Sequence, residues 1–533
     1  MITGTSVRSL ARNHHSCDGH RAVYTLNTSS NQSMAEKTAI TRAIGWWQGI
    51  LPATIERRHL MMGITCLFFV VTFFIYHSFD QGPTAFNIPI LTADAILHGR
   101  LDIANGKELT HIDWAFDRGK YYMVEPPGTV LTVLPGVALF GAGINQTTIS
   151  VVIGSLNAAA VHRLLVGLKK RISTQVALTI LFIFGTMYWW TATNGGVWYF
   201  AHTLAVLFLF AAIYFTLVSR NPFVAGFFLG CAYLTRLPTI FTTPFFLIMF
   251  SDLWLKWSND VPIWKRFDLR PLALFGLGLG IFIAFAAVYN YLRFATVMPG
   301  TAYDRWLDYH RATLQPSAIT HGLFDRSYIS RHLPVILKEL PIFKGSEPYI
   351  VIPQGGMALW LTTPAFIYAF FVGARGRIAW ALTIALLALG VTIGVVFARG
   401  MPDFIHRFSD DFPKGLNFPG QIELFPFITL IALAIVIGTR HRDKLVLACW
   451  AAIILTAIPH IFVAFNGFPQ FGYRFALDYY PFLFLLVVKG MGENLKWHHY
   501  AIIAICVVIN FMGVLWWYEF TPDHARGVDW LAW

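Results

Sequence analysis

Residues 60–76 read LMMGITCLFFVVTFFIY, an apolar run without a single charge, and Asp80 follows it within one helical turn. A run of this kind predicts a helix in lipid rather than in water. The composition agrees, because 56% of the 533 residues are hydrophobic, only 13% are charged and the mean hydropathy is +0.56. Such a chain lacks the polar surface of a soluble protein. The sequence therefore predicts an all-α, polytopic membrane protein.

Similar apolar runs recur along the chain and give about thirteen candidate transmembrane helices. They are residues 60–76, 147–167, 174–191, 198–218, 222–235, 238–255, 272–291, 356–374, 378–397, 422–438, 444–464, 480–490 and 498–517. Together they predict a transmembrane domain over residues 60–517.

The net charge of +12 has a topological explanation. If the first span runs outward, the basic loops at 169–171, 265–266, 375–377, 440–442 and 489–496 all lie inside, as the positive-inside rule requires. This orientation holds only if residues 128–143 do not cross. We therefore expect an interfacial or re-entrant helix there, entered through Pro126 and Pro127. The basic residues indicate membrane topology, and no nucleic-acid partner is expected.

This orientation divides the rest of the chain. Residues 1–59 are polar, lack a signal-peptide pattern and are expected to be a cytoplasmic segment. The outer side would carry a first loop, 77–146, with juxtamembrane helices, and a second large loop, 292–355. Shorter outer segments are 398–421, 465–479 and a tail at 518–533.

Several kinds of site have no sequence signal. The five cysteines show neither CxxC nor His/Cys spacing, so we expect no disulfide framework and no zinc site. No P-loop, dinucleotide fingerprint or HExxH motif is present, and no GxSxG motif has a supporting context. Nucleotide-driven transport and serine hydrolysis are therefore disfavoured.

The strongest local signal is Asp80, which holds a carboxylate at the membrane surface. There it suits a general base for a hydroxyl nucleophile. It equally suits a solvated residue that ends a span. The same loop carries further acids that have the chemistry to divide acid and base roles or to hold a divalent cation. These are Asp94, Asp102, Asp113, Asp117 and Glu125. Asp94 shares a helical face with His98, and we expect a structural role for that pair.

Three arginines, Arg236, Arg293 and Arg474, stand at the outer ends of predicted spans. A guanidinium offers a planar fork of donors that suits phosphate or pyrophosphate. The alternative is snorkelling, or pairing with a neighbour such as Asp478 for Arg474. His202 lies just inside a span, where a packed interface histidine is expected more often than a catalyst.

The order and placement of these features resemble the C-type (GT-C) superfamily of integral membrane glycosyltransferases. The likeness is to the bacterial branch with protein O-mannosyltransferases and the lipid A aminoarabinose transferase. Beyond Asp80 and the acid-rich loop, its motifs are Tyr-x-x-x-Pro-Pro at 122–127, a span ending in a basic cluster at 161–171, Ala-Tyr-Leu-Thr-Arg-Leu-Pro at 232–238 and Tyr-Asn-Tyr-Leu-Arg-Phe at 289–294. The thirteen-span count is similar too.

The resemblance implies an inverting transfer of a sugar from a polyprenyl-phosphate donor to a glycan, lipid or protein acceptor. Asp80 would be the base, and the arginines would stabilise the departing phosphate. Glu125 stands where the family often has Lys before Pro-Pro, and Lys120 would supply the missing charge. The implied substrate-binding residues are Glu125, Lys120, Asp94, Tyr122, Arg236, Arg293, Tyr303, Arg474 and His202. The site would face the periplasmic or extracellular side of the plasma membrane.

Two other functions stay open. A secondary transporter or lipid flippase would place charges or broken helices near the membrane midplane, whereas this chain keeps its charges at the interfaces. A scaffold of an envelope-building complex would leave the acid-rich first loop unexplained. The transferase is the favoured interpretation.

Overall fold

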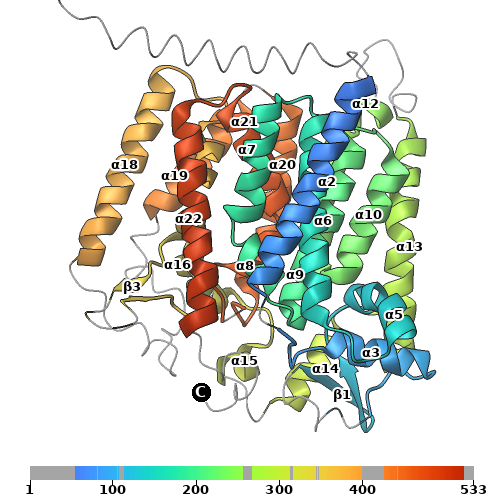
Figure 1. The fold of residues 1–533 in the computed structure, drawn as a ribbon. Coiled ribbons are helices and arrows are strands. Elements are labelled where there is room, and N and C mark those ends of the chain that lie inside the picture. Colours follow the sequence, from blue (N-terminus) through green and yellow to red (C-terminus); the bar gives the residue numbers. More distant parts are fainter. Residues whose placement is uncertain are drawn as a thin grey trace, which may run out of the picture. The chain divides into compact units, whose positions relative to one another are not determined.

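Figure 1 shows the computed structural model of the chain. The structure describes residues 55–80, 82–104, 106, 113–255, 267–311, 316–343, 345, 347, 349–398, 425–440, 442–467 and 469–520. The predictions for residues 1–54, for the loop at 399–421 and for the tail from 521 onward lie outside these residues. The chain divides into two units, 1–62 and 63–533. Helix α2 begins in the first unit, and every other described element belongs to the second.

Six described helices are long and apolar enough to cross a membrane. They are α2 (Ile55–Ser78), α6 (Gln146–Gly167), α9 (Val197–Leu217), α13 (Leu269–Phe294), α20 (Lys444–Phe462) and α22 (Trp497–Phe520). Each matches a span expected from the sequence. The structure is mostly helical and confirms a multi-pass α-helical membrane protein; the count of thirteen spans and the GT-C fold stay predictions.

The other predicted spans form shorter or interrupted helices. They are α7 (Ile172–Phe184) with α8 (Tyr188–Thr193), α10 (Pro222–Thr235), η1 (Leu237–Thr242) with α11 (Thr243–Met249) and α12 (Ser251–Trp254), α17 (Leu359–Thr362) with η4 (Pro364–Phe371), α18 (Arg377–Ala398), α19 (Phe425–Thr439) and α21 (Tyr480–Met491). The breaks have local causes. Pro238 and Pro364 lack the N–H that a continuing helix needs, and α7 ends at Gly185, whose N–H bonds the Leu181 carbonyl at 2.9 Å.

Small residues let α10 and α13 pack closely. A Cβ atom on Gly226 would collide with the Phe275 carbonyl, and one on Gly278 would collide with the Phe223 carbonyl. Membrane helices associate through such small residues because lipid offers no hydrophobic drive between them. The other side of α13 exposes large apolar side chains, including Leu277, as expected for a lipid-facing surface.

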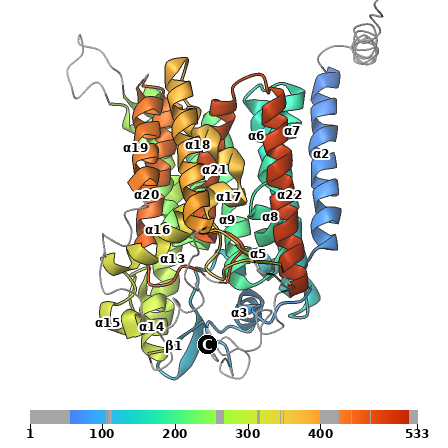
Figure 2. The same cartoon turned by 90° about the vertical axis from the view of Figure 1, so that its left-hand side faces the viewer.

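The second unit gathers its non-spanning elements at one end of the long helices, as both views show (Figures 1 and 2). They are α3 (Ile88–Leu97), strands β1 (Trp114–Asp117) and β2 (Lys120–Met123), α5 (Gly128–Phe140), α14 (Thr301–Tyr309), α15 (Pro316–His321), η3 (Arg326–Tyr328), α16 (Ile329–Leu337), strands β3 (Ile342–Phe343) and β4 (Ile350–Val351), and η7 (Arg474–Asp478). Segments predicted to share the outer side therefore lie together. Helix α5 coincides with the expected interfacial helix.

The β1–β2 hairpin is a feature that the sequence analysis did not predict. Trp114 pairs with Met123 and Asp117 with Lys120. Arg118 and Gly119 both have positive φ angles, 50° and 80°, which is the backbone of a two-residue hairpin turn. The hairpin packs on α14 through Phe116 and Tyr309, whose rings lie 5.2 Å apart.

Ion pairs connect loops at the opposite end of the helices. Lys170 contacts Glu493 at 2.6 Å, and Lys489 contacts Asp443 at 2.6 Å. These pairs tie loops between spans to one another, in the region that the sequence places inside.

The close packing of α10 and α13 predicts opposite outcomes for two glycines of one helix. Gly278→Ala should lower the thermal midpoint in detergent, because overpacking costs about 1–3 kcal/mol. Gly280→Ala is the matched control, since nothing lies within 4 Å of an added Cβ there. Equal midpoints for the two variants would contradict the close approach of these helices.

Candidate functional site

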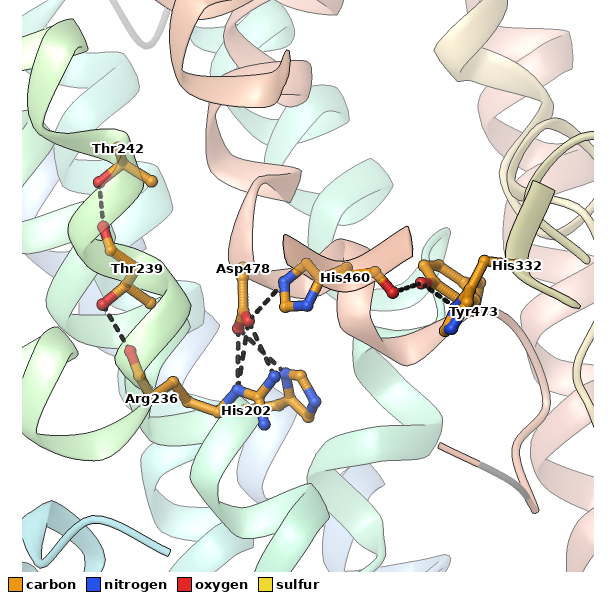
Figure 3. A network of polar contacts seen from close by, with 8 residues as sticks. All are labelled: His202, Arg236, Thr239, Thr242, His332, His460, Tyr473 and Asp478. Carbon is orange, nitrogen blue, oxygen red and sulfur yellow. Dashed lines mark hydrogen bonds and ion pairs between the residues drawn. The ribbon is translucent and has the colours of Figure 1, made fainter. Parts of the chain in front are cut away.

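A buried carboxylate, that of Asp478 in η7, joins four elements (Figure 3). Arg236, which ends α10, donates from Nη2 to Oδ2 at 2.9 Å and from Nε to Oδ1 at 3.1 Å. His202 of α9 places Nδ1 3.2 Å from Oδ1. His460 of α20 places Nε2 3.0 Å from Oδ2. The Asp478 side chain is 0% exposed, so all its contacts come from the protein.

The network extends in two directions (Figure 3). On one side the Arg236 carbonyl accepts a hydrogen bond from Thr239 at 2.8 Å, which fixes the turn into η1. On the other side the Tyr473 hydroxyl lies 3.3 Å from the His460 carbonyl and 2.8 Å from Nδ1 of His332. The network therefore connects α9, α10, α16, α20 and η7.

Electrostatics make Asp478 and Arg236 an ion pair. Burial alone would raise the pKa of Asp478, but the Arg236 guanidinium and the two histidines outweigh it and hold that pKa well below its ordinary value. Burial also opposes the charge of Arg236, yet Asp478 raises its pKa above the usual value. The sequence offered Arg474 as a local partner for Asp478; the structure pairs Asp478 with Arg236 instead.

A second buried group contains Glu125, Asp113 and Tyr303. Burial, and then the nearby Asp113, raise the pKa of Glu125 to about 8, although Arg236 and Arg474 oppose the rise. Burial also raises the pKa of Asp113 to about 6, against hydrogen bonding to Trp198 and the charge of Arg474. Burial and Glu125 raise the pKa of Tyr303. Two of the predicted binding residues, Glu125 and Tyr303, thus lie together.

Arg474 is a buried cation held mainly by aromatic rings. Its guanidinium lies 4.8 Å from the ring centre of Tyr199 and 5.9 Å from those of Trp198 and Phe475. The residue is 6% exposed, and its Nε and Nη1 have no hydrogen-bond partner among the described residues. Arg474 is therefore a cation with unused donors.

Arg293, in the last turn of α13, lies in a pocket. Its Nη1 donates to the Met123 carbonyl and its Nη2 to Asn290 Oδ1, both at 2.7 Å. The residue is 4% exposed, and none of the ion pairs among the described residues involves it. The pocket is lined by Val124, Pro126, Pro127, Leu237, Ala286, Tyr289, Asn290, Arg293 and Pro299. Arg293 Nε and the Tyr289 hydroxyl are buried and have no partner in the described part of the chain.

Asp80, the predicted base, lies two residues beyond the end of α2. Its Oδ2 is 2.7 Å from His77 Nδ1, and its Oδ1 accepts a hydrogen bond from the Gly82 N–H at 3.0 Å. The preceding Phe79 packs edge-on against Trp189 and Phe511. The carboxylate thus caps a turn at the end of the first span, and its catalytic role stays a prediction.

The remaining predicted residues lie on the surrounding loop. Lys120 pairs with Asp102 at 3.0 Å in an exposed position on the hairpin. Asp94 lies 3.7 Å from His98, as their helical spacing predicts. Tyr122 packs its ring against Phe294 at 5.2 Å. None of these contacts reaches the Asp478 network within the residues that the structure describes.

Sequence reasoning missed Asp478 and His460 as members of one network. A signal was present, because each is a polar residue in or beside an apolar run, and such residues are rarely tolerated without a partner. Asp113 was grouped with four other loop acids and had no feature to separate it. No group of three or more His, Cys, Asp or Glu residues within the described ranges is placed to hold a metal ion.

Comparison of the chain with protein-family models, with curated proteins and with solved structures finds no match. Its function has therefore to be inferred from the arrangement of its own residues. That arrangement comprises the Asp478 network, the Glu125–Asp113 pair beside Arg474, and the Arg293 pocket.

The Asp478 network predicts a large loss of stability on removal of one charge. Asp478→Asn leaves Arg236 buried without its carboxylate, and breaking a buried pair typically costs about 3–5 kcal/mol. The thermal midpoint in detergent should fall well below that of the wild type. Asp102→Asn is the control, because its Lys120 partner is exposed and such pairs contribute little. A wild-type midpoint for Asp478→Asn would argue against the ion pair.

Proposed function

We propose that the protein is an integral membrane glycosyltransferase. It would move a sugar from a polyprenyl-phosphate donor to a hydroxyl acceptor at the end of the helices where the loops gather, with inversion at the anomeric carbon. The observation that carries this proposal is the Arg293 pocket, which combines a buried guanidinium with apolar walls.

A buried cation without an anionic partner is costly, so a site of this kind favours an anion supplied from outside. Arg293 has a carbonyl and an amide as neighbours, and Tyr289 and Phe294 cover its guanidinium at 3.9 and 4.6 Å. Its planar donors suit the oxygens of a phosphate. The unused donor and the charge of the Arg293 guanidinium therefore support binding of one phosphate group.

The walls of the pocket indicate what carries that phosphate. Val124, Leu237, Ala286 and the prolines form an apolar lining beside the guanidinium. A ligand that fits both parts has a phosphate joined to a hydrocarbon chain. Polyprenyl phosphate has both features, which supports a lipid-linked donor.

The reaction would take place beside this pocket. Val124 and Pro126 line it, while Glu125 between them is influenced by Arg236 and Arg474. The anomeric carbon is bonded to a phosphate oxygen, so a sugar would extend from Arg293 toward this group. Arg293 would stabilise the charge that develops on the departing phosphate.

Removing the Arg293 charge should weaken donor binding. We expect Arg293→Met to bind a radiolabelled polyprenyl-phosphate sugar about 10- to 100-fold more weakly, since a hydrogen bond to a charged group is worth about 1.5–3 kcal/mol. Arg311→Met is the control, because Arg311 is exposed and pairs with Asp308.

Binding and release of polyprenyl phosphate would be measured in nanodiscs with a panel of donor sugars and a membrane extract as acceptor source. If the wild type binds and consumes no donor, the transferase proposal fails and transport assays take its place.

The resemblance gives the role of base to Asp80, and this is tested separately. If it is correct, Asp80→Asn should lower turnover about a hundredfold or more, as loss of a general base does, and leave donor binding unchanged. Asp308→Asn, an exposed acid of α14, should keep full activity. An active Asp80→Asn enzyme would preserve the transferase class and require another base.

A further inference from the structure

The open end of the β1–β2 hairpin brings two acids together. Trp114, the first residue of β1, pairs with Met123, the last residue of β2. Asp113 therefore directly precedes β1, and Val124 and Glu125 directly follow β2. Asp113 has a positive φ of 65°, a backbone conformation that Asp tolerates better than most residues. Asp113 is therefore opposite Val124 and one residue from Glu125, and Tyr303 of α14 and Arg474 of η7 both act on the Glu125 carboxyl.

Each of these carboxyl groups has an oxygen that the structure leaves unused. Asp113 Oδ2 and Glu125 Oε2 are buried and have no hydrogen-bond partner among the described residues. Glu125 is only 8% exposed. A buried carboxyl oxygen without a donor is rare in a purely structural role, because it loses its hydration without compensation. Both oxygens are thus available to a proton or to a hydroxyl group.

The surrounding charges favour one shared proton on this pair. Arg236, Arg474 and the Tyr303 hydroxyl face Glu125 or Asp113, together with the indoles of Trp198 and Trp306. Arg236 is already neutralised by Asp478, and His202 and His460 lie behind that carboxylate. Among the described residues that act on the two acids, Arg474 is then the one cation left to compensate them. Two neighbouring buried carboxyls with one free cation are expected to hold one proton between them.

We propose that Asp113 and Glu125 act as a proton-sharing pair that takes the proton of the acceptor hydroxyl during sugar transfer. This inference rests on the proposed function and moves the base from Asp80 to the pair. The acceptor oxygen forms a bond to the anomeric carbon as the bond from that carbon to the phosphate oxygen breaks. The electron pair of the broken bond leaves with the lipid phosphate. The hydroxyl proton passes to ionised Asp113, while protonated Glu125 donates a hydrogen bond within the site.

The pair predicts a bell-shaped dependence of kcat/KM on pH. With pKa values of about 6 for Asp113 and about 8 for Glu125, activity rises as Asp113 ionises and falls as Glu125 loses its proton. Glu125→Gln should remove the alkaline limb. Burial is the cause that raises the pKa of Asp113, so the acid limb should stay near its wild-type position.

The experiment compares Asp113→Asn, Glu125→Gln, Asp80→Asn and the control Asp308→Asn in nanodiscs between pH 5 and 9.5, with the radiolabelled polyprenyl-phosphate sugar that the wild type consumes. Asp113→Asn should lose about a hundredfold in turnover with donor binding retained. Glu125→Gln should lose the alkaline limb of the profile. Asp80→Asn should stay active. If Asp113→Asn does not fold, the Glu125→Gln profile decides alone, and a profile with both wild-type limbs overturns the proposal.

A second readout separates this inference from the proposed function. Infrared difference spectra of the wild type should show one buried carboxylic acid that loses its proton near pH 8 and is absent from Glu125→Gln. That signal with no donor consumption would refute the transferase and leave the shared proton in place. Donor consumption without that signal would overturn the pair alone.

Discussion

The ion pair between Arg236 and Asp478 is the interaction on which the candidate site depends. It joins the end of α10 to η7, and His202 and His460 attach α9 and α20 to the same carboxylate. Both charges are buried, so neither can move away without exposing the other to an apolar interior. The geometry of every nearby group is thereby fixed relative to Asp478, and Arg474, four residues earlier in the sequence, is held in place with its charge left over.

The three arginines predicted from the sequence therefore differ in whether the protein itself supplies an anionic partner for the guanidinium. Arg236 is fully engaged by Asp478, whereas Arg293 and Arg474 are buried among carbonyl, amide and aromatic groups. Each of the last two keeps a guanidinium nitrogen without a partner in the described structure. Buried cations without anionic partners form a preorganised site for anions. Folding has already removed them from water, so no further desolvation of the cations is needed when an anion binds. A phosphate fits this arrangement better than a neutral ligand does.

The sequence predicted the features that local pattern determines. Long apolar runs gave the six long helices, and the spacing of Asp94 and His98 gave their contact. The breaks at Gly185 and Pro364 divide runs that hydropathy alone treats as continuous. The β1–β2 hairpin had a signal in Asp-Arg-Gly between aromatic residues, yet a short strand in an acid-rich loop is easily overlooked. The partner of Asp478 was beyond reach, since Arg236 lies 242 positions away and Arg474 offered a nearer alternative.

The Val124–Pro127 segment links the two halves of the proposed site. Glu125 precedes Pro126, which restricts it to an extended backbone, and the two prolines cannot join a longer helix at its interior. Helix α5 therefore starts directly after them, and Glu125 stays outside it. Val124 and the two prolines line the Arg293 pocket. A ligand in this pocket would therefore contact the residues that directly flank Glu125 in the sequence. In the proposed reaction this segment carries an acid and no cation, so Arg293 would compensate the phosphate charge and Glu125 would serve proton transfer.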